Sequence, residues 1–301
     1  MLVIIMKLKD LHVRDPFILP FEGKYYFLFS PGKYAWEGKD GFYVTVSEDL
    51  EEWSEPKKVF TPPEGFWSNN NFWAPEMHYY KGEFYIFASF GAKVGHNRAV
   101  QILKAKSPLG PFEVWSCPLT LSHLNSIDGT LYVENGTPYL VYSREVIDDP
   151  DRIGSLWAVE LTDDLKAPVG DHTLIFKGTA PEWSEYKWEK KKTDPLTAWV
   201  AEGPFFYKNS DGKLLMLWSS HYGAGNYIEA VAYTENGALF GEWKHCKKFL
   251  MDSNGGHGML FKTFDGQLKF TLHFPNSPFG EERAVIHTVE EIGVDPFLKI
   301  K

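Results

Sequence analysis

Short runs of aromatic and aliphatic residues alternate with polar turns along the chain, and one arrangement of them occurs five times. Each copy has a polar residue, an apolar run, a Gly-containing turn and a second aromatic-rich run, which is the pattern of a β-hairpin. The five leading residues are Asp15, Glu76, Asp128, Glu202 and His257. Units repeated in this way are typical of propeller blades. We therefore expect the five side chains to meet at one end of a central axis.

The length of each unit also fits a propeller. The leading residues are separated by 61, 52, 74 and 55 positions, which leaves room for four strands with their loops in each blade. No long segment has the 3.6-residue apolar period of a helix. In four units a further strand follows the hairpin, at 42–46, 99–104, 156–161 and 230–233. The sequence predicts an all-β, five-bladed β-propeller that forms a single domain over residues 1–301.

Composition and charge narrow the classes of partner. The chain has 301 residues, of which 44% are hydrophobic, so a large core can form. The net charge of −9 argues against a surface for nucleic acid or anionic membranes. No stretch approaches 18 apolar residues, so no membrane span is expected. The basic run Lys187 to Lys192 lies in a predicted loop, where a solvated run is expected.

The start of the chain and the cysteines bear on location. The apolar run in Met1 to Lys9 is too short for the core of a signal peptide, so we expect a cytoplasmic protein. This run is expected to form an outer strand that helps to close the ring. Cys117 and Cys246 are expected to be reduced thiols, since they lie far apart in the sequence. The sequence leaves the oligomeric state open.

Tryptophans gather at predicted loops. We expect long, functional loops at 31–41, 61–72 and 171–197. In or beside them lie Trp36, Trp67, Trp73, Trp183, Trp188 and Trp199. A flat indole can stack on the C–H face of a sugar ring, but each of these residues can equally pack between blades.

The leading carboxylates suggest acid–base chemistry. Hydrolysis of a glycosidic bond needs one carboxylic acid to protonate the leaving oxygen and a second carboxylate to activate water or to attack. Like charges in a partly desolvated site raise at least one pKa, which separates these two roles. Taken alone, Asp15 and Asp128 read as turn residues, Glu202 as a strand-end charge and His257 as a core histidine. Their recurrence at matching positions of successive units favours a shared site.

Five short motifs make the hypothesis specific. In order along the chain they are His12-Val13-Arg14-Asp15-Pro16-Phe17-Ile18, Trp73-Ala74-Pro75-Glu76-Met77-His78, Ile127-Asp128-Gly129-Thr130, Ala201-Glu202-Gly203-Pro204 and Gly256-His257-Gly258. Together they resemble glycoside hydrolase family 43, which includes β-xylosidases and α-L-arabinofuranosidases. The resemblance runs from about residue 10 to about residue 290. It implies a five-bladed β-propeller whose members invert the anomeric configuration.

The resemblance also implies roles for the motif residues. Asp15 would be the general base, Glu202 the general acid, and Asp128 the residue that tunes and orients the acid. His257 would lie in the channel, where some members hold a metal ion, often calcium, within a shell of water. No cofactor is expected to be required. Four more residues are predicted at the substrate: Trp73, Arg283, Glu76 and Trp36. Of these, Glu76 is not needed for proton transfer and is also expected to be a structural group.

The sequence thus predicts an inverting exo-glycosidase that releases a terminal pentose from plant-derived oligosaccharides. The first choice of sugar is α-L-arabinofuranose and the second is β-D-xylose, while an endo-acting or a galactan-active enzyme remains open. A non-hydrolytic carbohydrate-binding propeller would keep the blades and tryptophans without a matched acid pair. A phosphorylase would need a cationic phosphate site, and the sequence shows no Arg or Lys pair next to Glu202.

Overall fold

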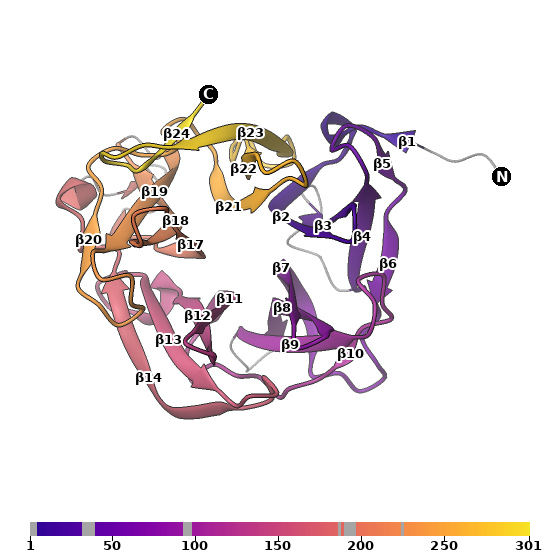
Figure 1. Ribbon diagram of the computed structural model, residues 1–301. Helices are drawn as coiled ribbons and strands as arrows, with labels where there is room; N and C mark the ends of the chain where they lie inside the picture. Colours follow the sequence, from indigo (N-terminus) through magenta and orange to yellow (C-terminus); the bar gives the residue numbers. More distant parts are fainter. Residues whose placement is uncertain (1–4, 32–39, 93–97, 186–187, 190–196, 224–225) are drawn as a thin grey trace.

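The computed structural model describes residues 5–31, 40–92, 98–185, 188–189, 197–223 and 226–301. Five four-stranded antiparallel sheets stand around a central axis (Figure 1). Helix in the described residues is limited to short 3-10 turns, η1 (Leu8–Asp10), η3 (Val146–Asp148) and η4 (Glu182–Glu185). The predicted all-β, five-bladed propeller is confirmed.

Each sheet is one blade, and its strands run in chain order from the axis to the rim. Blade 1 contains β2 (Val13–Phe21), β3 (Lys24–Pro31), β4 (Phe42–Ser47) and β6 (Lys57–Phe60); blade 2 contains β7 (Ser68–Tyr80), β8 (Glu83–Ala92), β9 (Ala99–Ala105) and β10 (Glu113–Val114); blade 3 contains β11 (Ser126–Glu134), β12 (Thr137–Arg144), β13 (Ser155–Leu161) and β14 (Pro168–Lys177); blade 4 contains β17 (Glu202–Lys208), β18 (Leu214–Tyr222), β19 (Asn226–Thr234) and β20 (Trp243–His245); blade 5 contains β21 (Gly256–Lys262), β22 (Leu268–Phe274), β23 (Arg283–Glu291) and β24 (Leu298–Ile300).

The hairpin turns lie where the sequence predicts them. In blade 3, Asn135 and Gly136 both have positive φ, as a two-residue hairpin requires. Two of the predicted loops are shorter than expected, because β7 begins at Ser68 and β14 continues to Lys177. The blade 2 extension contains three asparagines, Asn69 to Asn71, and pairing with β8 overrides their low strand propensity. The blade 3 extension includes Thr173, Ile175 and Phe176, which themselves favour a strand.

Aromatic packing fills the space between blades. Between blades 1 and 2, the rings of Phe42, Phe72 and Phe90 have centroids 4.9–5.8 Å apart. In blade 4, Trp183 stacks on the fully buried Trp218 at 5.5 Å. Trp183 therefore packs into the core, as the alternative interpretation of the loop tryptophans expects.

The inner strand of every blade carries a bulge at the same height. The strand register shifts just after Arg14, Trp73, Ile127, Glu202 and Gly256. The following residue has positive φ in each case: Asp15 51°, Ala74 43°, Asp128 54°, Gly203 60° and His257 52°. The predicted equivalence is therefore right in blades 1, 3 and 5. In blade 2 the equivalent residue is Ala74 rather than Glu76, and in blade 4 it is Gly203 rather than Glu202.

Side chains of the second strands hold these bulges from the preceding blade. Ser30 Oγ accepts the backbone N–H of Ala74 at 2.8 Å, and Ser89 Oγ accepts that of Asp128 at 2.9 Å. Ser219 Oγ accepts the N–H of His257 at 2.6 Å. Each bulge is thus fixed to its neighbouring blade, which makes the ring rigid at the level of the leading residues.

The ring closes between blades 5 and 1, which lie side by side (Figure 1). His12 bridges to Arg283, and the Arg283 guanidinium also donates to the backbone oxygen of Lys9 at 2.8 Å. The predicted outer strand is present as β1 (Ile5–Met6), which pairs with β5 (Trp53–Ser54) on the outside of blade 1, while contact with blade 5 is made further along the chain, at Lys9.

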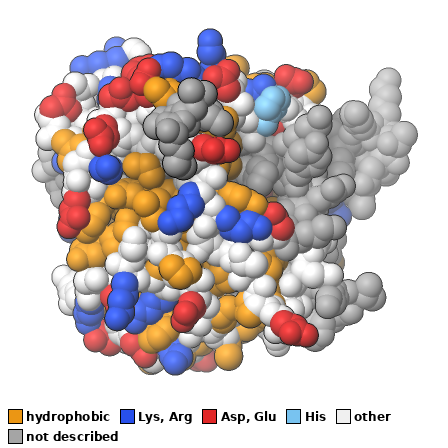
Figure 2. All heavy atoms as spheres, turned by 90° about the vertical axis from the view of Figure 1, so that its right-hand side faces the viewer, with side chains coloured by type: hydrophobic (Ala, Val, Ile, Leu, Met, Phe, Trp, Pro, Cys, Tyr) orange, Lys and Arg blue, Asp and Glu red, His pale blue; other side chains and the backbone are white. Residues whose placement is uncertain are grey.

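The surface, the membrane-span prediction and the cysteines can be compared with the sequence-based expectations. Acidic and basic side chains lie interspersed with hydrophobic ones on the face shown in Figure 2. In the part of the chain that the structure describes, no helix has the length and apolar character to cross a membrane. Cys117 is exposed and Cys246 is buried, and both are free thiols, as expected.

Candidate active site

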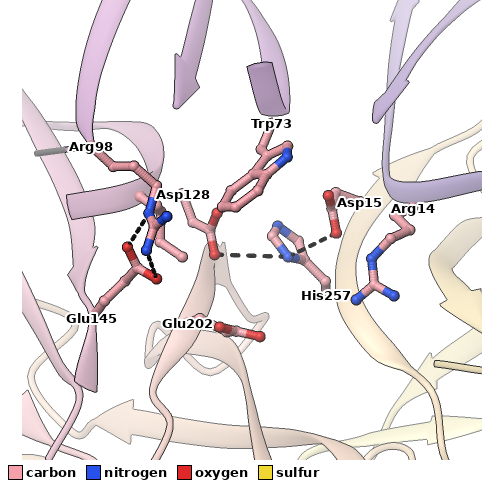
Figure 3. A pocket seen from close by; sticks show the side chains of 9 residues that line it. Arg14, Asp15, Trp73, Arg98, Asp128, Glu145, Glu202 and His257 are labelled. Carbon is pink, nitrogen blue, oxygen red and sulfur yellow. Dashed lines mark hydrogen bonds and ion pairs between the residues drawn. The ribbon is translucent and has the colours of Figure 1, made fainter. Parts of the chain in front are cut away.

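A cavity of about 160 Å³ opens at the bulged end of the central axis (Figure 3). It is lined by Arg14, Asp15, Trp73, Arg98, Ile127, Asp128, Glu145, Glu202 and His257. The three predicted catalytic carboxyls thus share one cavity with the predicted channel histidine and one predicted tryptophan.

The bulges explain why these side chains reach the cavity. Asp15, Asp128 and His257 have left-handed backbone conformations, which cost about 1–3 kcal/mol each for residues other than glycine. In blade 4 glycine suits the same position, because a Cβ on Gly203 would lie 3.0 Å from Cγ of the His257 ring and would crowd it. The carboxyl of this blade therefore comes from the preceding residue, Glu202.

Asp15 is held as a carboxylate. Burial alone would raise its pKa, but the cations of His257 and Arg14 lower it below the usual range. Its Oδ1 lies 3.2 Å from Nδ1 of His257. Its backbone N–H donates to Nδ1 of His273 at 3.3 Å. An ionised Asp15 is the state that a general base requires.

His273 supports Asp15 as a neutral ring. Its Nδ1 accepts the N–H of Asp15, while Nε2 lies 3.0 Å from Oδ1 of Asn276 and donates to it. Burial and the nearby Arg14 lower the pKa of His273 to about 3. The 3.6 Å approach of its Nδ1 to the Asp15 carboxylate is therefore not an ion pair, and we attribute the low pKa of Asp15 to His257 and Arg14.

His257 is the central cation of the site. Burial lowers its pKa, but the carboxylates of Asp15, Asp128 and Glu202 raise it to about 9. Its Nδ1 lies 3.2 Å from Asp15 Oδ1 and 3.8 Å from Asp128 Oδ2 (Figure 3). A protonated His257 thus links two of the three carboxyls and partly balances their charge.

Glu202 has the opposite tendency to Asp15. Burial raises its pKa, and this effect exceeds the hydrogen bond that Tyr227 Oη donates to its Oε1 at 2.7 Å. The negative charge of Asp15 also raises the pKa of Glu202. A carboxyl that keeps its proton near neutral pH is what a general acid requires.

Asp128 is electrostatically linked to Glu202. Burial raises the pKa of Asp128 to about 8; His257 opposes this rise, whereas Glu202 and Asp15 add to it. Its Oδ2 accepts the backbone N–H of Gly203 at 3.1 Å, so it is anchored directly beside the acid. Because the two carboxyls interact, they titrate as a pair that retains a proton near neutral pH.

Two arginines, Arg14 and Arg98, line the cavity, and the sequence did not reveal that they lie together there. The sequence-based expectation that no pair of basic residues lies near Glu202 is therefore wrong. Arg14 donates from Nη1 to Oε1 of Glu282 at 2.7 Å, and Arg98 forms a bidentate pair with Glu145. Both arginines are thus neutralised by glutamates, which is a poor arrangement for binding a phosphate ion.

Of the other residues predicted at the substrate, the structure places some at the cavity and others away from it. Trp73 lines the cavity, but Arg283 does not, because its guanidinium is taken up in ring closure. Glu76 is buried outside the cavity lining, with Oε2 3.1 Å from Nε2 of His78, in keeping with a structural group. Trp36 lies outside the described residues.

A calcium ion near His257 stays a prediction. In the described ranges, no group of three or more His, Cys, Asp or Glu side chains is arranged to hold a metal ion. Calcium takes six to eight oxygen ligands, whereas Nδ1 of His257 is already engaged by Asp15 and Asp128. These protein groups alone do not make a calcium site.

Comparison with known proteins identifies the family. Residues 9–296 match the family model described as glycosyl hydrolases family 43. The chain belongs to this family. It is therefore a glycoside hydrolase with a carbohydrate substrate, and the predicted resemblance and enzyme class are confirmed.

Two curated proteins with sequence similarity have names that refer to arabinan. The chain is 26% identical over 134 residues to "Extracellular endo-alpha-(1->5)-L-arabinanase 1" of Bacillus subtilis (strain 168), covering 40% of this chain and 38% of that protein. It is 29% identical over 176 residues to "Probable arabinan endo-1,5-alpha-L-arabinosidase C" of Aspergillus clavatus, covering 52% of this chain and 48% of that protein. The matched regions thus span half or less of these relatives.

Solved structures of the family agree over nearly the whole propeller. An endo-arabinase from Bacteroides thetaiotaomicron VPI-5482 superposes with a TM-score of 0.85 at 33% identity, covering 96% of this chain and 98% of that one. A thermostable family-43 glycoside hydrolase superposes with a TM-score of 0.79 at 27% identity, covering 96% and 93% of the two chains.

Proposed function

We propose that this family 43 enzyme cleaves α-L-arabinofuranosyl linkages in linear arabinan and its oligosaccharides, with inversion at the anomeric carbon. The observation that carries the proposal is the pair of carboxyls Asp15 and Glu202, which line one cavity with pKa values shifted in opposite directions. The choice of arabinan is supported by the relatives, three of which are named as endo-arabinanases or an endo-arabinase.

In the proposed reaction, the sugar to be cleaved lies between Asp15 and Glu202. The Asp15 carboxylate takes a proton from a water molecule as that water attacks the anomeric carbon. Glu202 gives its proton to the departing glycosidic oxygen, so the C–O bond breaks to a neutral alcohol. Exchange of protons with solvent then returns both residues to their starting states. Inversion requires the two carboxyls to be about 6.5–9.5 Å apart, to leave room for the water.

The remaining residues prepare the pair for these roles. His257 keeps Asp15 ionised because its positive charge lies against the carboxylate. Asp128 shares a proton with Glu202, so the pair stays singly protonated near neutral pH, and the Gly203 N–H fixes its position. Negative charge in the cavity also favours the oxocarbenium character of the transition state.

Internal cleavage is proposed in place of the exo action that the sequence suggested, since the relatives named above are endo enzymes. The test is digestion of debranched arabinan, arabinotriose, and para-nitrophenyl α-L-arabinofuranoside and β-D-xyloside. We expect a rapid fall in arabinan viscosity with mixed oligosaccharide products. Release of arabinose alone would support exo action, and preferential cleavage of the xyloside would overturn the choice of sugar. Proton NMR of the first-formed sugar tests inversion.

A further inference from the structure

The cavity contains a charged pair that the proposed proton transfers do not use. Arg98 directly precedes β9, and Glu145 directly follows β12. Nε of Arg98 lies 2.5 Å from Oε2 of Glu145, and Nη2 lies 3.0 Å from Oε1. The Arg98 guanidinium carbon also lies 5.3 Å from the centroid of the Trp73 ring. This is a bidentate pair of fixed geometry, braced by an aromatic face.

The backbone of both partners is held by one residue. Asn125 accepts the N–H of Arg98 on its Oδ1 at 3.0 Å and that of Glu145 on its backbone oxygen at 2.9 Å. The Asn125 amide in turn donates to Oδ1 of Asp148 at 2.9 Å. The Arg98 and Glu145 side chains are only 22% and 17% exposed. The pair is therefore pre-organised, unlike a surface ion pair between two mobile side chains.

The pair lies across the cavity from the base. Figure 3 shows Arg98 and Glu145 at one side and Asp15 with Arg14 at the other. Burial raises the pKa of Glu145 against the effect of Arg98, and Glu202 adds to the rise. In the proposed inverting reaction the water that Asp15 activates attacks from the face opposite the leaving oxygen, so the departing sugar lies on the side away from Asp15.

We propose that the Arg98–Glu145 pair binds the sugar on the leaving-group side of the scissile bond. The Glu145 carboxylate accepts hydrogen bonds from the sugar hydroxyls. Arg98 donates from Nη1, for which no hydrogen bond is found within the described residues. The pair therefore favours the cleavage of substrates whose leaving group is a sugar over those with a simple aryl leaving group. This inference rests on the proposed function.

The test compares two substrates that share the sugar to be cleaved but differ in the leaving group. Para-nitrophenyl α-L-arabinofuranoside places no sugar on the leaving-group side, whereas arabinotriose does. We expect Glu145→Gln to lower kcat/KM for arabinotriose by about 10-fold to 100-fold, the effect of losing a hydrogen bond to a charged group. The aryl glycoside should change by less than about threefold. Arg98→Lys, which keeps the charge without the bidentate fork, should show the same split.

The chain offers a matched control at the rim of the same blade. Lys104 Nζ lies 2.5 Å from Oε2 of Glu83 and 3.9 Å from the Trp115 ring centroid, outside the cavity. Glu83→Gln should leave kcat/KM unchanged for both arabinotriose and the aryl glycoside. Melting temperatures of all variants separate a loss of binding from a loss of folding. An equal fall on both substrates in a folded Glu145→Gln variant, or no fall on either, overturns the inference.

A binding measurement separates this inference from the proposed function. Calorimetric titration of arabinotriose into Glu202→Gln and into Glu202→Gln/Glu145→Gln needs no turnover. A 10-fold or greater loss of affinity in the double variant supports the pair, and equal affinities overturn it. If the wild-type enzyme cleaves no arabinoside although the pair affects binding, only the proposed hydrolysis fails. If arabinotriose does not bind at all, both fail.

Discussion

Asp15 and Glu202 are carboxyls in one cavity, yet their surroundings shift their pKa values in opposite directions. Both are buried, and burial raises the pKa of each. The difference lies in the balance: at Asp15 the cations of His257 and Arg14 exceed the effect of burial, whereas at Glu202 burial exceeds the same two cations and the hydrogen bond from Tyr227. The comparison teaches that the balance between burial and nearby cations, and not burial alone, divides the base from the acid here.

Asp15→Asn is expected to have the largest effect, because it removes the base and keeps the shape. Asn tolerates positive φ nearly as well as Asp, so the bulge should survive. We expect kcat to fall by about 100-fold to 10,000-fold on both arabinotriose and the aryl arabinofuranoside, since water must be activated for either. Steady-state kinetics checks this. A variant that retained activity on one of the substrates would remove Asp15 from the base role.

Glu202→Ala removes the general acid, the second carboxyl of the comparison. On arabinotriose, kcat should fall by about 100-fold to 10,000-fold, because a sugar alkoxide is a poor leaving group without a proton. On the aryl glycoside the fall should be much smaller, because nitrophenolate leaves without help. The ratio of the two kcat values is the measurement. Equal losses on both substrates would contradict the assignment of Glu202 as the acid.

His257→Asn should raise the pKa values of both Asp15 and Glu202. The imidazolium lowers the pKa of Asp15, Asp128 and Glu202, so its loss raises all three. An opposite charge at this range shifts a carboxyl by about 1–3 pH units. We expect the acidic limb of kcat/KM against pH to move upward by about that amount, and the basic limb to move upward as well. An unchanged acidic limb would show that His257 does not set the ionisation of Asp15.

The same variant has a signature in stability. The pKa of His257 is about 9 in the folded protein and about 6.5 in an unfolded chain. Its contribution to stability is therefore complete below pH ~6.5 and is lost as the pH rises through about 9. The difference in melting temperature between wild type and His257→Asn should accordingly shrink over that interval, as thermal unfolding at several pH values can show.

The sequence predicts the repeating parts of this site better than the individual ones. The five hairpins follow from alternation and Gly-containing turns, and Asp15, Asp128 and His257 stand at equivalent bulges. The motif alignment places Glu76 at the blade 2 position, but the bulge there falls at Ala74. A two-residue difference in where a bulge forms is decided by packing between blades, which a single sequence does not display.

Contacts between different blades were also beyond the sequence. Arg98 and Glu145 come from blades 2 and 3 and are 47 residues apart, and neither lies in a motif. A hint exists in the topology, because residues that begin a third strand or end a second strand lie at the bulged end of a blade. The contribution of His273, which closes the ring against Asp15, likewise needs the position of the last blade beside the first.

Tyr227→Phe gives the finest test of the comparison, because it removes the hydroxyl whose hydrogen bond lowers the pKa of Glu202. Its loss should raise that pKa further, so the acid keeps its proton to higher pH. A hydrogen bond contributes about 0.5–1.5 kcal/mol, and one pKa unit corresponds to about 1.36 kcal/mol. The basic limb of kcat/KM for arabinotriose should therefore move upward by about one pH unit or less.

The matched control for this change is Tyr142→Phe. Tyr142 is equally buried, and its hydroxyl lies 2.8 Å from Nδ1 of His172 in blade 3, outside the cavity lining. Tyr142→Phe should leave the acidic and basic limbs of kcat/KM against pH unchanged. A downward move of the basic limb in Tyr227→Phe would mean that the hydroxyl stabilises the protonated form of Glu202. The division between acid and base would then depend on a proton donated toward Tyr227, and not on burial acting against the cations around Asp15.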